Sequence, residues 1–178
     1  MIILYLLIID INRLLFLFFV GVIIYFLFKK VLRKNSKHTH NIKLSARILN
    51  KINTFEYSGQ KINYIRKIDP FVFEELVLNA FESKGYKIKR NKRYTGDGGI
   101  DGIIYSKSNR VVILQVKRYS SYIKLQHLKD FKFLIIKNKA AYGYFIHTGK
   151  TGKFSKEFAA GSNINIISGN KLIELISR

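Results

Sequence analysis

The sequence predicts an α/β domain, in which helices flank a mixed β-sheet, preceded by one N-terminal transmembrane helix. Two apolar strand patterns joined by a short turn predict a hairpin, and strand and helix patterns alternate after it. The first 28 of the 178 residues are almost wholly aliphatic or aromatic. These observations divide the chain into a transmembrane anchor over residues 1–32, a basic linker over 33–67 and a compact domain over 68–178.

The expected anchor contains an uninterrupted apolar run at residues 14–28, which as a helix is about 22 Å long. A bilayer core is about 30 Å thick, so the span must extend to Leu32, with Lys29 and Lys30 reaching toward the headgroups. A cleavable signal peptide is the alternative, but no small-x-small cleavage site follows the run. Lysines and arginines crowd its C-terminal flank, which predicts a single-pass protein of the cell membrane with its C-terminal domain in the cytoplasm.

The formal net charge is +21, and nearly all of the charged residues follow position 28. Such a charge favours a polyanionic partner, either nucleic acid or an anionic lipid surface. A surface that is basic only for solubility is the simpler alternative, although such surfaces usually mix both signs. The chain has no cysteine, which excludes disulfides, thiolate zinc sites and cysteine nucleophiles.

Local signals set the expected elements in chain order. A patchy apolar rhythm at 42–52 predicts one short helix inside the linker, ended by Gly59. The compact domain opens with a helix that has Asp69 as its N-cap, Pro70 in its first position and Gly85 at its end. Alternating patterns then predict strands at 86–91, 100–105, 110–117, 141–148 and 164–168, and helices at 123–138, 153–161 and 170–177.

The stretch GDGGIDG and the strand RVVILQVK carry the candidate site. Asp101 begins the first hairpin strand, whereas Gln115 and Lys117 lie near the end of its antiparallel partner. The turn at 107–109 therefore brings all three to one end of the hairpin. Gln115 and Lys117 are two residues apart, so both point to the same face of the strand. A carboxylate, an amide oxygen and an ammonium at one sheet edge suit a divalent cation and a phosphate.

These residues resemble a known family. The FE helix start followed by GY, then GDGGIDG, then QVKRY, looks like the Mrr-type catalytic domain of the PD-(D/E)xK nucleases, a restriction-endonuclease-like fold. The similarity covers residues 68–176 and corresponds to the variant with Gln in place of the first acidic residue of the last motif. It implies that Asp101 and Gln115 bind metal, that Lys117 completes the QxK pair and that Glu74 is the helix glutamate that helps to hold metal or its water.

The resemblance also implies an activity and its partners. Family members cleave DNA with Mg²⁺ or Mn²⁺, often as restriction enzymes that act on modified foreign DNA, and double-stranded DNA is the expected substrate. A homodimer is left open. This chain departs from the better-known members because it carries an expected membrane span and no separate DNA-recognition domain, which puts its target and its restriction role in question.

Neighbouring residues allow other interpretations. We choose Glu74 over Glu75 because it shares a helix face with Val77 and Phe81, whereas Glu75 faces polar residues and is expected in solvent. Asp97 is interpreted as a turn residue beside glycine and is left out of the catalytic set.

Three features beyond the hairpin carry weaker signals. Tyr119, Tyr122 and Lys124 have the chemistry to stack on or pair with nucleic acid, which the sequence leaves open. His147 is interpreted as a surface or core histidine and not as a ligand. The segment HTGKTGK lacks the spacing of a phosphate-binding loop, which excludes nucleotide binding there.

The expected function is that of a membrane-anchored, magnesium-dependent DNA endonuclease. A first rival is an inactive module of the same fold that tethers DNA to the membrane through its basic surface. A second is a membrane-interaction protein whose catalytic residues are relics. The joint presence of Asp101, Gln115 and Lys117 favours the enzyme, because a tether has no need of that combination.

Overall fold

The computed structural model describes residues 2–91, 98–106 and 108–177, without the side chains of 2–12 and 33–36. It divides into two compact units, Met1–His40 and Asn41–Arg178. Asp97, interpreted above as a turn residue, lies outside the described residues.

The first unit consists of the greater part of α1 (Ile2–Asn53), a helix of 52 residues whose last turns belong to the second unit. From Arg13 onward it contains an 18-residue window of mean hydropathy 2.3, and none of that window is buried. Within the described residues it is the one helix long and apolar enough to cross a membrane. Only length and composition identify it as such, and a signal sequence meets the same criteria.

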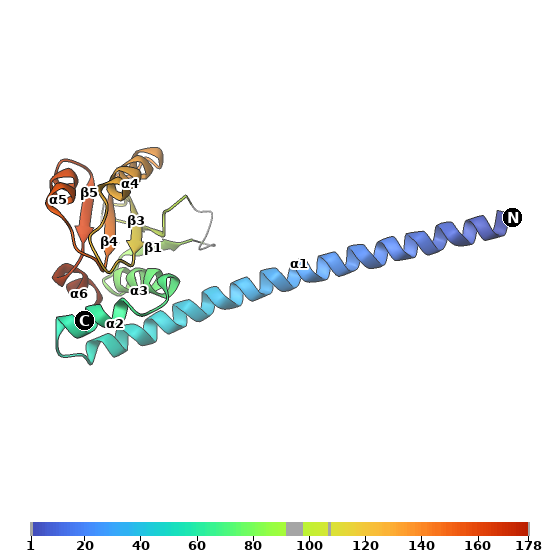
Figure 1. Ribbon diagram of the computed structural model, residues 1–178, viewed down its shortest axis with the longest axis horizontal. Coiled ribbons are helices and arrows are strands. Elements are labelled where there is room, and N and C mark those ends of the chain that lie inside the picture. Colours follow the sequence, from blue (N-terminus) through green and yellow to red (C-terminus); the bar gives the residue numbers. More distant parts are fainter. Residues whose placement is uncertain (1, 92–97, 107, 178) are drawn as a thin grey trace. The chain divides into compact units, whose positions relative to one another are not determined.

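The second unit is built on a five-stranded sheet with the order β1-β2-β3-β4-β5 (Figure 1). The first three strands pair antiparallel and the last two join in parallel, so the predicted mixed sheet is confirmed. The strands are β1 (Lys87–Arg90), β2 (Gly102–Tyr105), β3 (Val111–Lys117), β4 (Tyr142–His147) and β5 (Ile164–Ile167).

Helices cover both faces of this sheet, with α4 and α5 on one side and α3 and α6 on the other (Figure 1). Strand β3 is buried on both faces: Val112 and Leu114 join the core beneath α3 and α6, while Ile113 joins the core beneath α4 and α5. This alternation follows from the two-residue period of a strand. The remaining helices are α2 (Ser58–Ile65), α3 (Pro70–Ser83), α4 (Leu125–Lys137), α5 (Lys153–Ala160) and α6 (Asn170–Ile176).

The start of α3 follows the sequence signals. Asp69 Oδ1 accepts hydrogen bonds from the backbone N–H groups of Phe71 at 2.8 Å and Val72 at 3.3 Å, and Pro70 is the first helical residue. Gly85, with a φ of +84°, follows the helix and takes the left-handed conformation that glycine tolerates best. The capping prediction is therefore confirmed, and it fixes where α3 lies in the chain.

Residues 41–67 differ from the basic linker expected over 33–67. They complete α1 and form α2, and they bury Ile48, Ile52 and Ile65 in the core beneath α3 and α6. The apolar rhythm seen in the sequence is thus the buried stripe of a helix that belongs to the second unit. Gly59, expected to end that helix, lies inside α2 instead, and the break between the helices falls at 54–57.

Candidate active site

Asp101 lies immediately before β2 and is buried, with 8% of its surface exposed. Its backbone N–H donates to the carbonyl of Leu114 at 2.9 Å, and its Oδ2 accepts from the backbone N–H of Val116 at 2.6 Å. Hydrogen bonds to an ionised carboxylate are short and strong. The carboxylate is therefore fixed against the end of β3, as the hairpin geometry predicted.

The side chain of Gln115 is oriented by a single hydrogen bond. Its Nε2 donates to the carbonyl of Gly99 at 2.8 Å. Since a carbonyl only accepts, the amide nitrogen must face Gly99 and Oε1 must face away from it. Within the described residues Oε1 accepts no hydrogen bond. Gly99 has a φ of +87°, and a Cβ there would lie 3.2 Å from Nε2, so the approach suits glycine.

Lys117 completes the group at the end of β3. Its Nζ lies 3.9 Å from Oδ2 of Asp101, and its side chain is 39% exposed. Both Gln115 and Lys117 line a cavity of about 170 Å³, as expected for side chains two residues apart on one strand. The structure therefore brings Asp101, Gln115 and Lys117 together.

Glu74 lies on α3 and is buried, with 9% of its surface exposed. Leu78, one helical turn later on the same face, packs against the first residue of β2: a Cβ on Gly102 would lie 2.5 Å from Cδ2 of Leu78. The helix face that carries Glu74 therefore packs on the sheet beside Asp101. Its role at the site remains a prediction.

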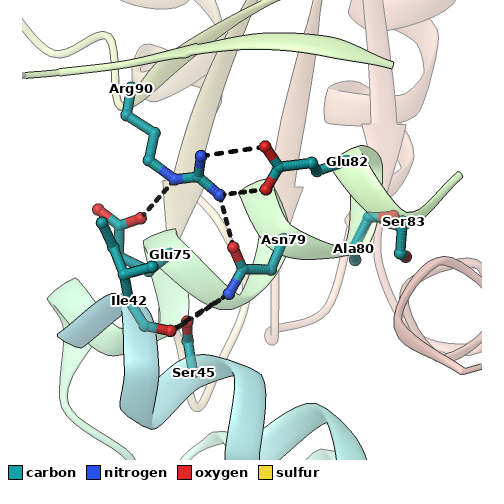
Figure 2. Close-up of polar contacts among 8 residues, drawn as sticks. All are labelled: Ile42, Ser45, Glu75, Asn79, Ala80, Glu82, Ser83 and Arg90. Carbon is teal, nitrogen blue, oxygen red and sulfur yellow. Dashed lines mark hydrogen bonds and ion pairs between the residues drawn. The ribbon is translucent and has the colours of Figure 1, made fainter. Parts of the chain in front are cut away.

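Glu75 corrects one expectation. It is 2% exposed, and its Oε2 accepts from Nε of Arg90 on β1 at 3.1 Å. Figure 2 shows that the same guanidinium also binds Glu82 at 2.6 Å and Asn79 at 2.5 Å. The prediction that Glu75 faces solvent is wrong, because an arginine from another element supplies the counter-charge that the spacing on α3 does not reveal.

The electrostatics of this cluster are self-consistent. Burial would lower the pKa of Arg90, but hydrogen bonds and attraction from Glu82 and Glu75 raise it above its ordinary value. The hydrogen bond from Arg90 lowers the pKa of Glu82. Asn79 extends the cluster to α1, since its Nδ2 donates to Oγ of Ser45 at 2.7 Å (Figure 2). The cluster thus fastens β1 and the last part of α1 to α3.

Two residues of α4 line the same cavity as Gln115 and Lys117, and the sequence interpretation did not include them. They are His127 and Asp130. His127 Nδ1 lies 2.8 Å from the hydroxyl of Tyr119, and the two rings stack with centroids 5.4 Å apart. His127 and Asp130 are three residues apart near the start of α4, so they lie on one face of the helix. That spacing is the sequence signal that would have indicated them.

His147 ends β4 directly opposite Lys117 in the parallel register and is fully buried. Its Nε2 lies 3.1 Å from Oγ1 of Thr151. Burial lowers the pKa of His147 to about 4, because desolvation disfavours the charged imidazolium. The residue is therefore a neutral core histidine, one of the two interpretations that the sequence allowed.

The arrangement supplies oxygen donors suited to a hard cation. The Asp101 carboxylate and Gln115 Oε1 are the kinds of ligand that Mg²⁺ and Mn²⁺ bind. Among the described residues no hydrogen-bond donor occupies the outward-facing Oε1. In that part of the chain no group of three or more His, Cys, Asp or Glu side chains is placed to hold a metal ion. A site here therefore depends on the amide and on backbone or substrate oxygens.

This fold and this group of side chains define a nuclease-like α/β domain. Residues 65–176, more than half of the chain, match the Mrr_cat family, described as a restriction endonuclease. The chain therefore belongs to the Mrr catalytic-domain family of restriction endonucleases.

The similarity to an individual relative is modest. The chain is 29% identical over 126 residues to the Type IV methyl-directed restriction enzyme EcoKMrr of Escherichia coli (strain K12), which covers 67% of this chain and 41% of that protein. The chain thus matches less than half of the relative's length.

Two solved structures also resemble the chain. The DNA modification-dependent restriction endonuclease AspBHI has a TM-score of 0.48 at 17% identity, covering 71% of this chain and 37% of that one. The MspJI restriction endonuclease, in complex with a 27-mer oligonucleotide, has a TM-score of 0.43 at 19% identity, covering 74% of this chain and 30% of that one. These scores add nothing to the family assignment.

Proposed function

We propose that this protein is a membrane-anchored, divalent-metal-dependent DNA endonuclease that hydrolyses phosphodiester bonds. The observation that supports the proposal is the meeting of Asp101, Gln115 and Lys117 at the end of β3. Family membership supports the nuclease class. The net charge of +21 supports a polyanionic substrate.

Each residue has a role that its geometry supports. Asp101 and Gln115 would hold Mg²⁺ or Mn²⁺, with Glu74 helping from α3. The bound cation would offset the negative charge of the scissile phosphate and favour ionisation of the attacking water. Lys117 donates hydrogen bonds to the phosphate or to the attacking water, where its positive charge stabilises the charge that builds up in the transition state. Buried Asp101 keeps that ammonium at the site.

The biological setting is the second part of the proposal. The apolar window of α1 would anchor the protein in the cell membrane, and the lysines that follow it would keep the second unit in the cytoplasm. Foreign DNA, including modified DNA, is the proposed target, by analogy with the methyl-directed restriction enzyme to which the chain is similar. Restriction or defence is the corresponding role.

A cleavage assay tests the activity. The full chain is solubilised in detergent and incubated with supercoiled plasmid DNA, methylated and unmethylated, in Mg²⁺, Mn²⁺ or EDTA. We expect nicked and linear products only with a divalent cation. Asp101→Asn should abolish these products, because the amide carries no negative charge for the metal. The variant should still fold, since its amide oxygen can accept the hydrogen bond from Val116. Equal cleavage in EDTA would contradict the proposal, and binding without any cleavage would favour the tethering module.

Fractionation tests the location. We expect the full chain to sediment with membranes and to float with them in a density gradient. Protease added to intact cells should leave the C-terminal domain intact, whereas digestion from outside would reverse the proposed topology.

A further inference from the structure

The loops that follow β3 and β4 join into a short ladder beyond the sheet. The backbone N–H of Ile123 donates to the carbonyl of Lys150, and that of Lys150 donates to the carbonyl of Ser121, both at 3.0 Å. Tyr122 and Lys150 form a parallel bridge between them. We call these two segments, residues 118–123 and 148–152, the ridge.

Side chains lock the ridge to the rest of the second unit. Thr148 Oγ1 donates to the carbonyl of Tyr119 at 2.8 Å and accepts from its N–H at 2.9 Å. Arg66, from the turn after α2, donates twice to the carbonyl of Thr148, at 3.1 and 2.7 Å. At Gly149 a Cβ would lie 2.3 Å from the carbonyl oxygen of Ser121, so the two backbones meet where only glycine fits. The ridge is therefore a rigid element.

What the rigid ridge presents to solvent is an aromatic ring with a cation. Tyr122 is 62% exposed, and Nζ of Lys150 lies 5.8 Å from the centroid of its ring. Lys124, beside the ridge, and Lys153, at the start of α5, are also exposed. An exposed tyrosine side chain contributes little to the stability of the fold. Aromatic rings combined with lysines, in contrast, bind the bases and phosphates of single-stranded nucleic acid.

The ridge lies next to the candidate site along the chain and in the sheet. Strand β3 ends at Lys117 and β4 ends at His147, and these two residues are partners in the register. The ridge begins at the next residue of each strand. A nucleic acid strand bound at Lys117 therefore lies next to the first residues of the ridge.

From this geometry we propose that the ridge binds an unpaired segment of DNA beside the scissile phosphate, with Tyr122 stacked on an exposed base and Lys150 paired with a phosphate. In continuous duplex DNA each base is already stacked between its neighbours, so Tyr122 has a free base face only at a bubble, a gap or a strand end. The inference rests on the proposed nuclease function and specifies its substrate as DNA with unpaired bases.

A binding experiment without divalent cations tests the ridge separately from cleavage. The full chain in detergent is titrated, in EDTA, against a fluorescent duplex and against the same duplex with a short central bubble. We expect the parent to bind the bubble roughly tenfold more tightly than the duplex, the effect of about one stacked base. Tyr122→Ala should lose this preference, and Tyr122→Phe should keep it. A 2-aminopurine base in the bubble should change fluorescence with the parent and the Phe variant only.

Matched variants make the result specific. Tyr57→Ala removes a tyrosine that is also 62% exposed but lies before α2, and it should bind both DNAs like the parent. Lys150→Ala should weaken binding to both and reduce its salt dependence. Circular dichroism and thermal unfolding confirm that each variant is folded.

Two outcomes separate this inference from the proposed function. If the parent binds bubble and duplex equally, or if folded Tyr122→Ala keeps the preference, the ridge proposal is overturned even where plasmid is cleaved. If the Tyr122-dependent preference is present but no DNA is cleaved in any metal, the ridge proposal stands and the nuclease proposal fails.

Discussion

Nζ of Lys117 lies 3.9 Å from Oδ2 of Asp101 at the end of β3. This separation is longer than a hydrogen bond, so the two groups attract each other without closing a direct contact. The lysine side chain is 39% exposed, whereas that of Asp101 is only 7% exposed, and the backbone N–H of Val116 also donates to the buried carboxylate. The carboxylate is thus held mainly by the backbone, while the lysine lines a cavity that a ligand can enter.

Replacing Lys117 should affect catalysis far more than stability, because the backbone N–H of Val116 still donates to Asp101. We expect Lys117→Ala to lower the cleavage rate by about 10²–10³-fold, the usual effect of losing one group that stabilises transition-state charge. DNA binding in EDTA should remain, and the midpoint of thermal unfolding should stay close to that of the parent. The matched control is Lys137→Ala, an exposed lysine at the end of α4. Cleavage by folded Lys117→Ala at the parental rate would remove the lysine from the mechanism.

Gln115→Glu should have opposite effects with and without metal. The new carboxylate would face the carbonyl of Gly99, to which the parent amide donates at 2.8 Å, so we expect a loss of about 1–3 kcal/mol of stability in EDTA. The added charge should also strengthen metal binding and lower the Mg²⁺ concentration at half-maximal cleavage. The plateau rate need not rise, because the same charge attracts Lys117.

Two titrations measure these effects. Thermal unfolding with increasing Mg²⁺ should raise the midpoint of the Glu variant more than that of the parent. Cleavage at saturating DNA separates half-saturation from plateau rate. An unchanged half-saturation point in the folded variant would show that residue 115 does not touch the metal.

The meeting of Asp101, Gln115 and Lys117 was predictable because a hairpin is local. A short turn and the two-residue period of strands place its two ends together without knowledge of the rest of the fold. Glu75 was not predictable in this way, since its partner Arg90 comes from β1, after α3 in the chain. A helix-face argument detects apolar neighbours on the same helix and misses a counter-charge from another element.

Arg90→Met should destabilise the protein by about 3 kcal/mol, because it removes the guanidinium that donates to buried Glu75 and to Glu82. Combining it with Glu75→Gln should recover part of that loss, since an amide is less costly to bury than a charge. Denaturant unfolding of the single and double variants measures both values. Arg110→Met, at an exposed arginine, should change stability by less than about 0.5 kcal/mol. A double variant less stable than Arg90→Met would contradict the argument.

His147 should make folding sensitive to mild acid. Its pKa is about 4 in the folded protein against an ordinary value of 6.5, so below pH 6.5 the unfolded chain takes up a proton that the folded chain does not. The contribution of neutral His147 to the free energy of unfolding is fully present above pH 6.5. It is lost as the pH drops toward 4, by about 3 kcal/mol in total.

Comparison with His147→Gln isolates this effect from the carboxylates that also titrate in that range. We expect the loss of stability between pH 6.5 and pH 4 to be smaller in the Gln variant, measured by urea unfolding at each pH. Equal losses in the two proteins would show that the imidazole is protonated in the folded state.

The boundary of the second unit is the other feature that sequence signals located poorly. Residues 41–67 are basic and polar on average, which indicated a linker, but their apolar residues are spaced so that they form one buried stripe. Average composition hides such a stripe, and only the core that it joins, beneath α3 and α6, shows that these helices belong to the domain.

Truncations at the two boundaries should therefore behave differently. A protein of residues 41–178 keeps Ile48, Ile52 and Ile65, and we expect it to be soluble and to unfold cooperatively. A protein of residues 68–178 loses all three, which are between 0% and 6% exposed. Burying each contributes about 1.5–3 kcal/mol, and the sum approaches the total stability of an ordinary domain, about 5–15 kcal/mol. It also loses Arg66, which holds the carbonyl of Thr148.

Near-UV circular dichroism of the tyrosines during heating measures the difference between the two truncated proteins. If residues 68–178 alone unfolded cooperatively at the same temperature as 41–178, α2 and the end of α1 would be dispensable, and the domain would begin where the sequence pattern first placed it.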